Sequence, residues 1–204
     1  MPARGPGDLR SGTNSALLLT RQVMFETTTL TQWALDPVHS HVQFSVKHLV
    51  ISHVTGSFKT LRGSMQSAGD TFENAQVEFA LDVDSIDTNS ALRDGHLRGD
   101  IFFNAAKFPH ITFASTAFEK GEGDAYQLIG ILTMMDVAKP VTLAVTYGGQ
   151  ALDLYGNHRA GFEASASLNR KDFGLTWGGL TEAGTIVMGD DVKLTFNVQF
   201  IKQK

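Results

Sequence analysis

Cysteine is absent from this 204-residue chain, and tryptophan occurs only twice. Without cysteine the protein can form neither a disulfide framework nor a thiolate metal site. Basic charge is not in excess either, because 17 Lys and Arg face 21 Asp and Glu, for a formal net charge of −4. Proteins that bind nucleic acid need a basic face, so we expect no nucleic-acid partner. No apolar run approaches the roughly 20 residues of a membrane-spanning helix.

The first part of the chain has a different composition from the rest. Residues 1–32 carry proline and glycine without any periodic pattern, and their apolar run is Ala16–Leu19. A secretory signal needs roughly 7–15 apolar residues followed by a cleavage site of small residues. We therefore interpret residues 1–32 as a disordered leader and residues 33–202 as the folded domain. A cytoplasmic location is the resulting expectation.

Strict alternation of apolar and polar residues dominates the remainder of the chain. Val42, Phe44 and Val46 share one face of a predicted strand, and the last strand alternates in the same way from Val192 to Phe200. This period of two is typical of half-buried β-strands. We count about eight such strands, and none is joined to the next by a long crossover helix. The pattern predicts an all-β fold, either an antiparallel barrel or a sandwich.

One helix is predicted, within Asp87–Phe103, between the third and fourth strands. Several residues at its start are good N-caps. Asp94 and Arg98 are spaced for an i,i+4 ion pair, and Gly99 stands where a left-handed cap is expected. Because Gly95 costs roughly 1 kcal/mol relative to alanine, this short helix needs a surface to pack against.

The same helix contains the most enzyme-like combination of side chains. Arg93, Asp94 and His96 could provide an acid and a base, but no nucleophile motif accompanies them. We therefore predict no catalytic residues and interpret the segment as an ion-paired cover over the barrel. A hydrolase or stress-related enzyme that uses Asp94 and His96 is the alternative. His39 and His41 share a strand face without a third ligand, so we predict no metal site.

Arg170 is a second ambiguous residue, at the end of the seventh strand. A buried arginine needs a partner, which Asp172, Asp94 or Asp100 could supply. A structural ion pair is the preferred interpretation, and contact with a ligand is the alternative.

The interior could be a solid core or a lipid pocket. Phenylalanine is abundant, with 14 residues. Several residues expected to face inward are small, and we interpret them as leaving space; they are Gly56, Ala75, Ala117, Gly130, Ala160, Ala164 and Ala166. An elongated apolar pocket suits a lipid tail. A barrel that is packed solid, in a protein that only interacts with partners, remains the alternative.

Six blocks of sequence, in order across Trp33 to Phe200, resemble the YceI-like family. The first block comprises Trp33–Ser40, Phe44–Leu49 and Gly56–Phe58. The blocks continue with Arg93–Arg98, Lys107–Pro109 with Thr112 and Phe113, and Leu132–Thr133 with Lys139–Leu143. Asn169–Gly174 and Val187–Val192 complete the resemblance. In one departure, Ile101 precedes Phe102 and Phe103 where the family usually carries Asp, and the acid is displaced to Asp100.

The resemblance implies an eight-stranded, lipocalin-like antiparallel barrel with an elongated hydrophobic channel. It implies binding, storage or transport of a polyisoprenoid or another long-chain amphipathic lipid, with no enzyme activity and no cofactor. It also implies a homodimer, and transient membrane contact is expected. We expect the tail to contact Phe44, Val46, Phe58, Phe79, Phe113, Leu132, Phe162, Phe173 and Phe196. We expect the head group to lie near Arg93, His96, Arg98, Arg170 and Trp177.

Overall fold

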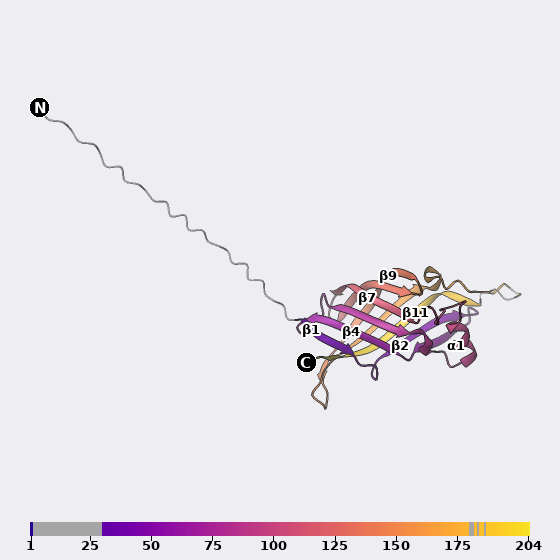
Figure 1. Ribbon diagram of the computed structural model, residues 1–204, viewed down its shortest axis with the longest axis horizontal. Coiled ribbons are helices and arrows are strands. Elements are labelled where there is room, and N and C mark those ends of the chain that lie inside the picture. The colour runs from indigo at the N-terminus through magenta and orange to yellow at the C-terminus, as the bar shows by residue number, and fades with distance from the viewer. Residues whose placement is uncertain (2–29, 180–181, 183, 186) are drawn as a thin grey trace.

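The computed structural model describes Met1 and residues 30–179, 182, 184–185 and 187–204. Figure 1 shows a β-barrel with the short helix α1 (Ala91–Arg98) at one end. The strands in chain order are β1 (Leu30–Leu35), β2 (His41–His48), β3 (Ser52–Phe58), β4 (Leu61–Ala68), β5 (Gln76–Asp82), β6 (Ile86–Asp87), β7 (His110–Lys120), β8 (Ala125–Met134), β9 (Val137–Leu152), β10 (His158–Asn169) and β11 (Met188–Lys202). Two 3₁₀ turns, η1 (Val83–Ser85) and η2 (Arg170–Phe173), complete the elements of the described residues.

The sheet closes on itself in the order β1-β4-β5-β7-β8-β9-β10-β11, with β11 pairing back to β1. All of these pairings are antiparallel, which confirms the predicted eight-stranded antiparallel barrel. Closure removes the free strand edges that would otherwise template aggregation.

The three remaining strands extend the barrel wall. β1 and β2 both pair with β11, and the hairpin partners β4 and β3 pair with β1 and β2 respectively. β1 and β2 therefore form one long strand that is bent in the middle, and β3 and β4 form a second. β5 continues into β6 in the same way, because β5 pairs with β4 and β6 pairs with β3. The predicted count of eight strands therefore corresponds to eight long strands. The helix lies between the third and fourth of them, as the sequence predicted.

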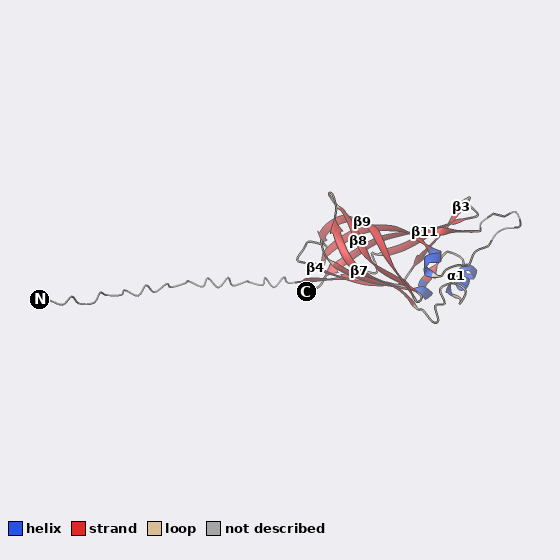
Figure 2. Ribbon diagram, turned by 90° about the horizontal axis from the view of Figure 1, so that it is seen from above, coloured by secondary structure: helices blue, strands red, loops and turns tan. Residues whose placement is uncertain are grey.

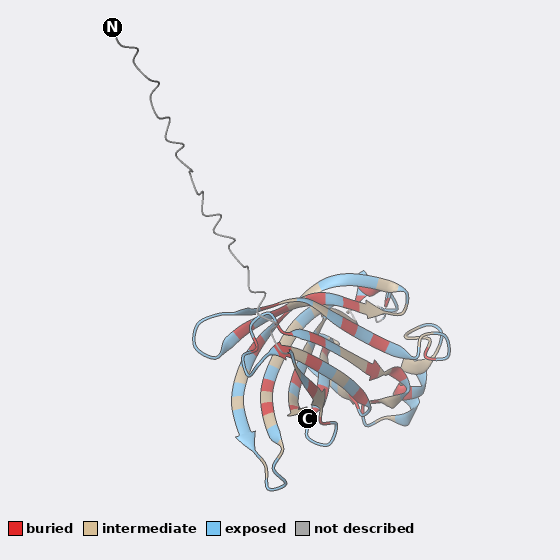
Figure 3. Cartoon of the chain, turned by 60° about the vertical axis from the view of Figure 1, so that its left-hand side comes forward, coloured by how far each residue is buried: buried red, intermediate tan, exposed pale blue. Residues whose placement is uncertain are grey.

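Inward-facing apolar residues fill the end of the barrel opposite α1. Phe72 packs against Trp33 and Phe162, with ring centroids 5.5 and 5.0 Å apart. The Trp33 indole N–H donates a hydrogen bond of 2.9 Å to Ser67, so this buried polar group is satisfied. Figure 3 shows the alternation of buried and exposed residues along the strands, which is the pattern read from the sequence.

The predicted leader and the predicted helix end both need correction. β1 begins at Leu30, so residues 30–32 belong to the barrel, while residues 2–29 of the predicted leader lie outside the described residues. Gly99 has φ −66° and ψ 169°, which is extended and not left-handed. The chain leaves the helix through a tight turn, in which the N–H groups of Phe103 and Ala105 satisfy the carbonyls of Leu97 and Arg98. These bonds replace those of a left-handed cap.

Candidate functional site

An apolar cavity lies inside the barrel at the α1 end. Its volume is about 100 Å³. Its lining is apolar except for Arg170, and consists of Phe44, Val46, Phe58, Phe79, Leu81, Leu97, Phe102, Phe103, Ile111, Leu132, Met134, Leu168, Arg170, Phe173, Leu175, Met188, Val192, Leu194 and Phe196. We call this the outer cavity.

A second cavity continues from the outer one toward the far end of the barrel. This inner cavity measures about 60 Å³. Every lining residue is apolar: Leu35, Val42, Leu61, Met65, Val77, Phe79, Leu81, Phe118, Leu128, Leu143, Val145, Phe162, Ala164, Phe196, Val198 and Phe200. Phe79, Leu81 and Phe196 line both cavities. The rings of Phe79 and Phe196, with centroids 5.4 Å apart, therefore stand at the boundary between them.

The outer cavity borders an open hollow at the α1 end, which we call the mouth. The mouth has a volume of about 400 Å³ and shares five lining residues with the outer cavity: Phe44, Val46, Leu97, Phe102 and Met188. Its other lining residues are Lys47, His48, Val54, Thr88, Arg93, His96, Ile101, Trp177 and Val187. Figure 2 shows α1 at one end of the barrel and the C-terminus at the other. The three spaces thus run in series from a partly polar opening into an apolar interior.

Most of the predicted tail-contact residues line these spaces. Phe44 and Val46 line both the mouth and the outer cavity, and Phe58, Leu132 and Phe173 line the outer cavity. Phe79 and Phe196 line both cavities, and Phe162 lines the inner one.

Phe113 is the predicted tail-contact residue that lines neither cavity. Its ring stacks on Phe79, with centroids 5.0 Å apart and planes 13° apart. Phe113 therefore packs beside Phe79, its directly paired neighbour, on the same face of the sheet.

Two of the small residues do not leave space in the barrel. A Cβ at Gly56 would lie 2.4 Å from Cζ of Phe44, and a Cβ at Gly130 would lie 2.5 Å from Cζ of Phe113. Aromatic rings from neighbouring strands cover these glycines, so the space predicted there is occupied by protein. Of the small residues in that prediction, Ala164 lines a cavity.

The predicted head-group residues occupy different places. Arg93, His96 and Trp177 line the mouth. Arg98 lines none of the three spaces, and its guanidinium donates to the carbonyl of Ile86 at 3.1 Å. Burial leaves its Nε without a hydrogen-bond partner among the described residues.

Arg170 forms a structural ion pair, as the sequence predicted, but its partner is not one of the three expected aspartates. It is 5% exposed, and its ion pair is with Asp190 at 3.0 Å, not with Asp172, Asp94 or Asp100. It also donates to the carbonyls of Gly189 at 2.9 Å and Trp177 at 2.6 Å, and to that of Leu175. These bonds hold the segment that carries Trp177 beside the start of β11.

The Lys171 ammonium and the Arg170 guanidinium hold the pKa of Asp190 below its usual value, against a smaller effect of burial. Both cations therefore keep this carboxylate charged.

Asp94 is likewise occupied structurally. It is 5% exposed, and it accepts hydrogen bonds from the Thr88 backbone N–H at 2.9 Å and the Thr88 hydroxyl at 2.6 Å. Arg93 donates to the same threonine, through Nε to the hydroxyl at 2.7 Å and through Nη2 to the carbonyl at 2.8 Å. The predicted pair of Asp94 with Arg98 is not formed. His96 is exposed and makes no side-chain hydrogen bond with Asp94, so the geometry gives the hydrolase alternative no support.

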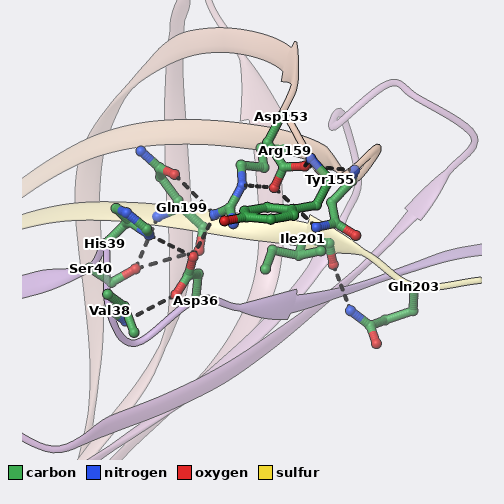
Figure 4. Close-up of polar contacts among 11 residues, drawn as sticks. Asp36, Val38, His39, Ser40, Asp153, Tyr155, Arg159, Gln199, Ile201 and Gln203 are labelled. Carbon is green, nitrogen blue, oxygen red and sulfur yellow. Dashed lines mark hydrogen bonds and ion pairs between the residues drawn. The ribbon is translucent and has the colours of Figure 1, made fainter.

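A polar network that the sequence analysis missed ties the opposite end of the barrel together (Figure 4). Arg159 on β10 bonds to Asp36 and, at 2.8 Å, to Asp153. His39 Nδ1 lies 2.8 Å from Asp36. Asp153 also accepts from the N–H groups of Asn157 and Tyr155, which shapes the β9–β10 turn.

Two pKa values in this network are strongly perturbed. Burial would raise the pKa of Asp36, but hydrogen bonds from Arg159, His39 and the Val38 N–H outweigh it and lower the pKa to about 2. Hydrogen bonds from Asn157 and Arg159 hold the pKa of Asp153 far below its usual value. Both carboxylates are therefore charged across the physiological range, and their role is to lock the turn to β1 and β10.

No group of three or more His, Asp or Glu in the described part of the chain is arranged to hold a metal ion. None of the helices there is long and apolar enough to span a membrane.

Comparison with known proteins identifies the domain. The family profile described as "YceI-like domain" matches residues 33–200. A UPF0312 protein of Yersinia pestis (strain Pestoides F) is 40% identical over 166 residues, which cover 81% of this chain and 83% of that protein.

Two solved structures have similar barrels. The YCEI protein of Campylobacter jejuni superimposes with a TM-score of 0.67 at 29% identity, covering 78% of this chain and 90% of that one. A polyisoprenoid binding domain from Saccharophagus degradans, implicated in plant cell wall breakdown, matches with a TM-score of 0.61 at 18% identity. That match covers 84% of this chain and 98% of the Saccharophagus domain, and it shows a shared fold. None of these three names describes an enzyme.

Proposed function

Because this chain belongs to the YceI-like family, we propose that it binds the tail of a polyisoprenoid or a similar long-chain amphipathic lipid inside the barrel. The observation that carries the proposal is the series of mouth, outer cavity and inner cavity, whose lining becomes wholly apolar with depth. Each CH₂ of a tail that leaves water there contributes about 0.8 kcal/mol. The name of the Saccharophagus domain supports the same ligand class.

The interior is narrow, and a long tail has to widen it. The inner cavity of about 60 Å³ and the outer cavity of about 100 Å³ are both smaller than the ~150 Å³ apolar cavity that admits benzene. We therefore propose that Phe79 and Phe196 turn aside as the tail passes between the cavities. An isoprenoid chain of sufficient length would then fill both.

The two tryptophans provide a direct experiment. Trp177 lines the mouth and is 45% exposed, whereas Trp33 is 1% exposed near the far end of the barrel. Titration with geranylgeraniol, a neutral C20 isoprenoid alcohol, should change the fluorescence of Trp177 saturably. The Trp177→Phe variant keeps only Trp33 as a reporter, and its smaller response separates binding at the mouth from general perturbation.

A blocked variant controls for binding to the outer surface. Val46 lines both the mouth and the outer cavity, so Val46→Phe would narrow the passage between them. We expect weaker geranylgeraniol binding in a variant that still folds by circular dichroism. Binding that is equal in the blocked variant would contradict a tail inside the barrel.

We further propose that the protein carries or stores this lipid without chemical conversion, and that the mouth touches membranes transiently. Exposed apolar side chains beside the mouth support membrane contact, among them Ile101 at 61% and Ile51 at 86% exposure. Flotation of wild type with phospholipid vesicles, compared with Ile51→Asp and Ile101→Asp, tests the contact. A homodimer is a separate proposal, which light scattering after gel filtration tests.

A further inference from the structure

The inner cavity ends in a layer of aromatic rings at the end of the barrel opposite α1. Phe118, Phe162 and Phe200 face the cavity, and Trp33 and Phe72 lie behind them. All five side chains are buried, so the layer separates the inner cavity from solvent at that end. We call these five rings the floor.

Phe162 is the centre of the floor. Its ring packs against four other aromatic rings at centroid distances of 5.0 to 6.2 Å: Phe72, Tyr147, Phe200 and Phe118. A ring that is packed on several sides has little free volume to turn into, because protein interiors are as dense as organic crystals. Phe79 and Phe196 differ from it, since empty space lies on both sides of their contact. We therefore expect a tail to displace those two rings and to stop at Phe162.

A loop holds the floor in place from outside the barrel. Residues 69–75 connect β4 to β5 and carry the buried Phe72 across the barrel end. Within this loop the Asp70 carboxylate pairs with Lys202 of β11 at 2.7 Å. The Asp70 carbonyl accepts a hydrogen bond from Nε2 of Gln150 on β9 at 3.2 Å. The loop is thus fastened to two strands of the rim, which keeps the Phe72 ring against the floor.

The distance from the mouth to the floor limits how much tail the barrel can enclose. Val192 lines the outer cavity and Phe200 lines the inner one, and both belong to β11. At about 3.3 Å per residue and a strand tilt of about 40°, the stretch between them spans about 20 Å along the barrel axis. An extended C20 isoprenoid has about this length, so a longer tail would leave its remainder outside the apolar interior.

We propose that the floor sets the length of isoprenoid tail that the protein selects, with Phe162 as the residue that determines the limit. Affinity rises with each isoprene unit until the end of the tail meets Phe162, and further units add nothing because they stay in water. The inference rests on the proposed function, since it concerns which tails the barrel encloses. The protein would then discriminate strongly among chains shorter than the limit and weakly among longer ones.

The test compares neutral ligands that differ only in length. Isoprenoid alcohols with C10, C15, C20, C25 and C30 chains are titrated against the full chain by Trp177 fluorescence, at concentrations below their self-association. Each added unit that the interior buries should tighten binding by at least about tenfold. The Kd of wild type should therefore fall up to C20 and stay nearly constant beyond it.

Two variants move the floor in opposite directions. Phe162→Ala lets the tail reach deeper, so the limit should shift to C25. Ala164→Phe places a ring one interior position nearer the mouth on β10, so the limit should shift to C15. Phe113→Ala is the matched control, because it truncates a buried ring that lines neither cavity and should keep the C20 limit. Circular dichroism establishes that each variant folds, and if one does not, the shift in the other decides.

The outcomes are distinct. A limit that Phe162→Ala lengthens or Ala164→Phe shortens, and that Phe113→Ala keeps, supports the floor as the determinant of length. Wild-type affinity that rises steadily through C30 overturns the inference while leaving the proposed function intact, as does a limit that no floor variant moves. Binding of none of the alcohols overturns the proposed function and the length limit together.

Discussion

The rings of Phe79 and Phe196 meet with centroids 5.4 Å apart and separate two apolar cavities that lie in series along the barrel. Phe79 comes from β5 and Phe196 from β11, so the contact crosses the interior between strands that are not neighbours in the sheet. Any tail that occupies both cavities has to pass this contact.

Phe79→Ala should therefore join the two cavities. We expect the empty protein to lose about 3 kcal/mol of unfolding free energy, as for other truncated core phenylalanines. Lipid that binds only the folded state should restore part of this loss. Urea unfolding with and without geranylgeraniol measures both effects.

Phe113→Ala is the control for that experiment. It removes the ring that stacks beside Phe79 but lines neither cavity. Phe113→Ala should lose unfolding free energy, and geranylgeraniol should restore less of that loss than it restores in Phe79→Ala. Equal recovery in both variants would contradict a tail that passes Phe79.

Gly56→Ala should destabilise the mouth. A Cβ there would lie 2.4 Å from Phe44 Cζ and 2.8 Å from Thr88 Cγ2, so either the ring or the Thr88 segment has to move. Overpacking of this kind costs about 1–3 kcal/mol. Gly161→Ala is the matched control in β10, because a Cβ there meets no atom within 4 Å. Thermal unfolding of both variants measures the difference, and an unchanged Gly56→Ala protein would contradict the packing.

Asp94→Asn tests the structural role of this carboxylate. The change weakens the acceptor of two hydrogen bonds from Thr88, and we expect a loss of about 1–3 kcal/mol in unfolding free energy. His96→Ala, on the same helix but exposed, should change stability by no more than about 0.5 kcal/mol. An Asp94→Asn protein as stable as wild type would mean that the buried bonds contribute little.

The network around Asp36 should make stability depend on pH in the acid range. The folded pKa of Asp36 is about 2, below the roughly 3.9 of a free aspartate. A lowered folded pKa contributes stability that is complete above the unfolded pKa and is lost as the pH falls through the folded one. Asp36 should thus contribute at most about 2–3 kcal/mol, lost between about pH 4 and pH 2.

Unfolding of wild type and Asp36→Asn between pH 7 and pH 2 measures this contribution. The stability difference between the two proteins should be constant down to about pH 4 and then narrow. A difference that is independent of pH would contradict the lowered pKa.

The fold was predictable because its signal is local. The alternation of Val42, Phe44 and Val46 assigns one face of β2 to the interior, and the same rule places most of the cavity lining. The bends that divide β1 from β2 and β3 from β4 have no comparable signal, since they arise where the barrel wall curves.

The site was predicted less completely, because its decisive contacts join distant residues. Asp36 meets Arg159 across 123 positions of sequence, and nothing local identifies the pair. The alternation that assigns Val46 to the interior gave no indication that its neighbour Lys47 lines the mouth. Glycines 56 and 130 were interpreted as empty space because sequence does not show which ring covers them. The cytoplasmic location and the homodimer remain predictions.

Organic extraction of the purified protein, followed by mass spectrometry, tests lipid binding most directly. The protein is expressed, purified without detergent and extracted beside an equal amount of the Val46→Phe variant. We predict a long-chain isoprenoid lipid near one equivalent per chain in wild type and much less in the variant. An empty wild-type extract, together with no saturable response to geranylgeraniol, would contradict lipid binding and favour a barrel that is simply packed.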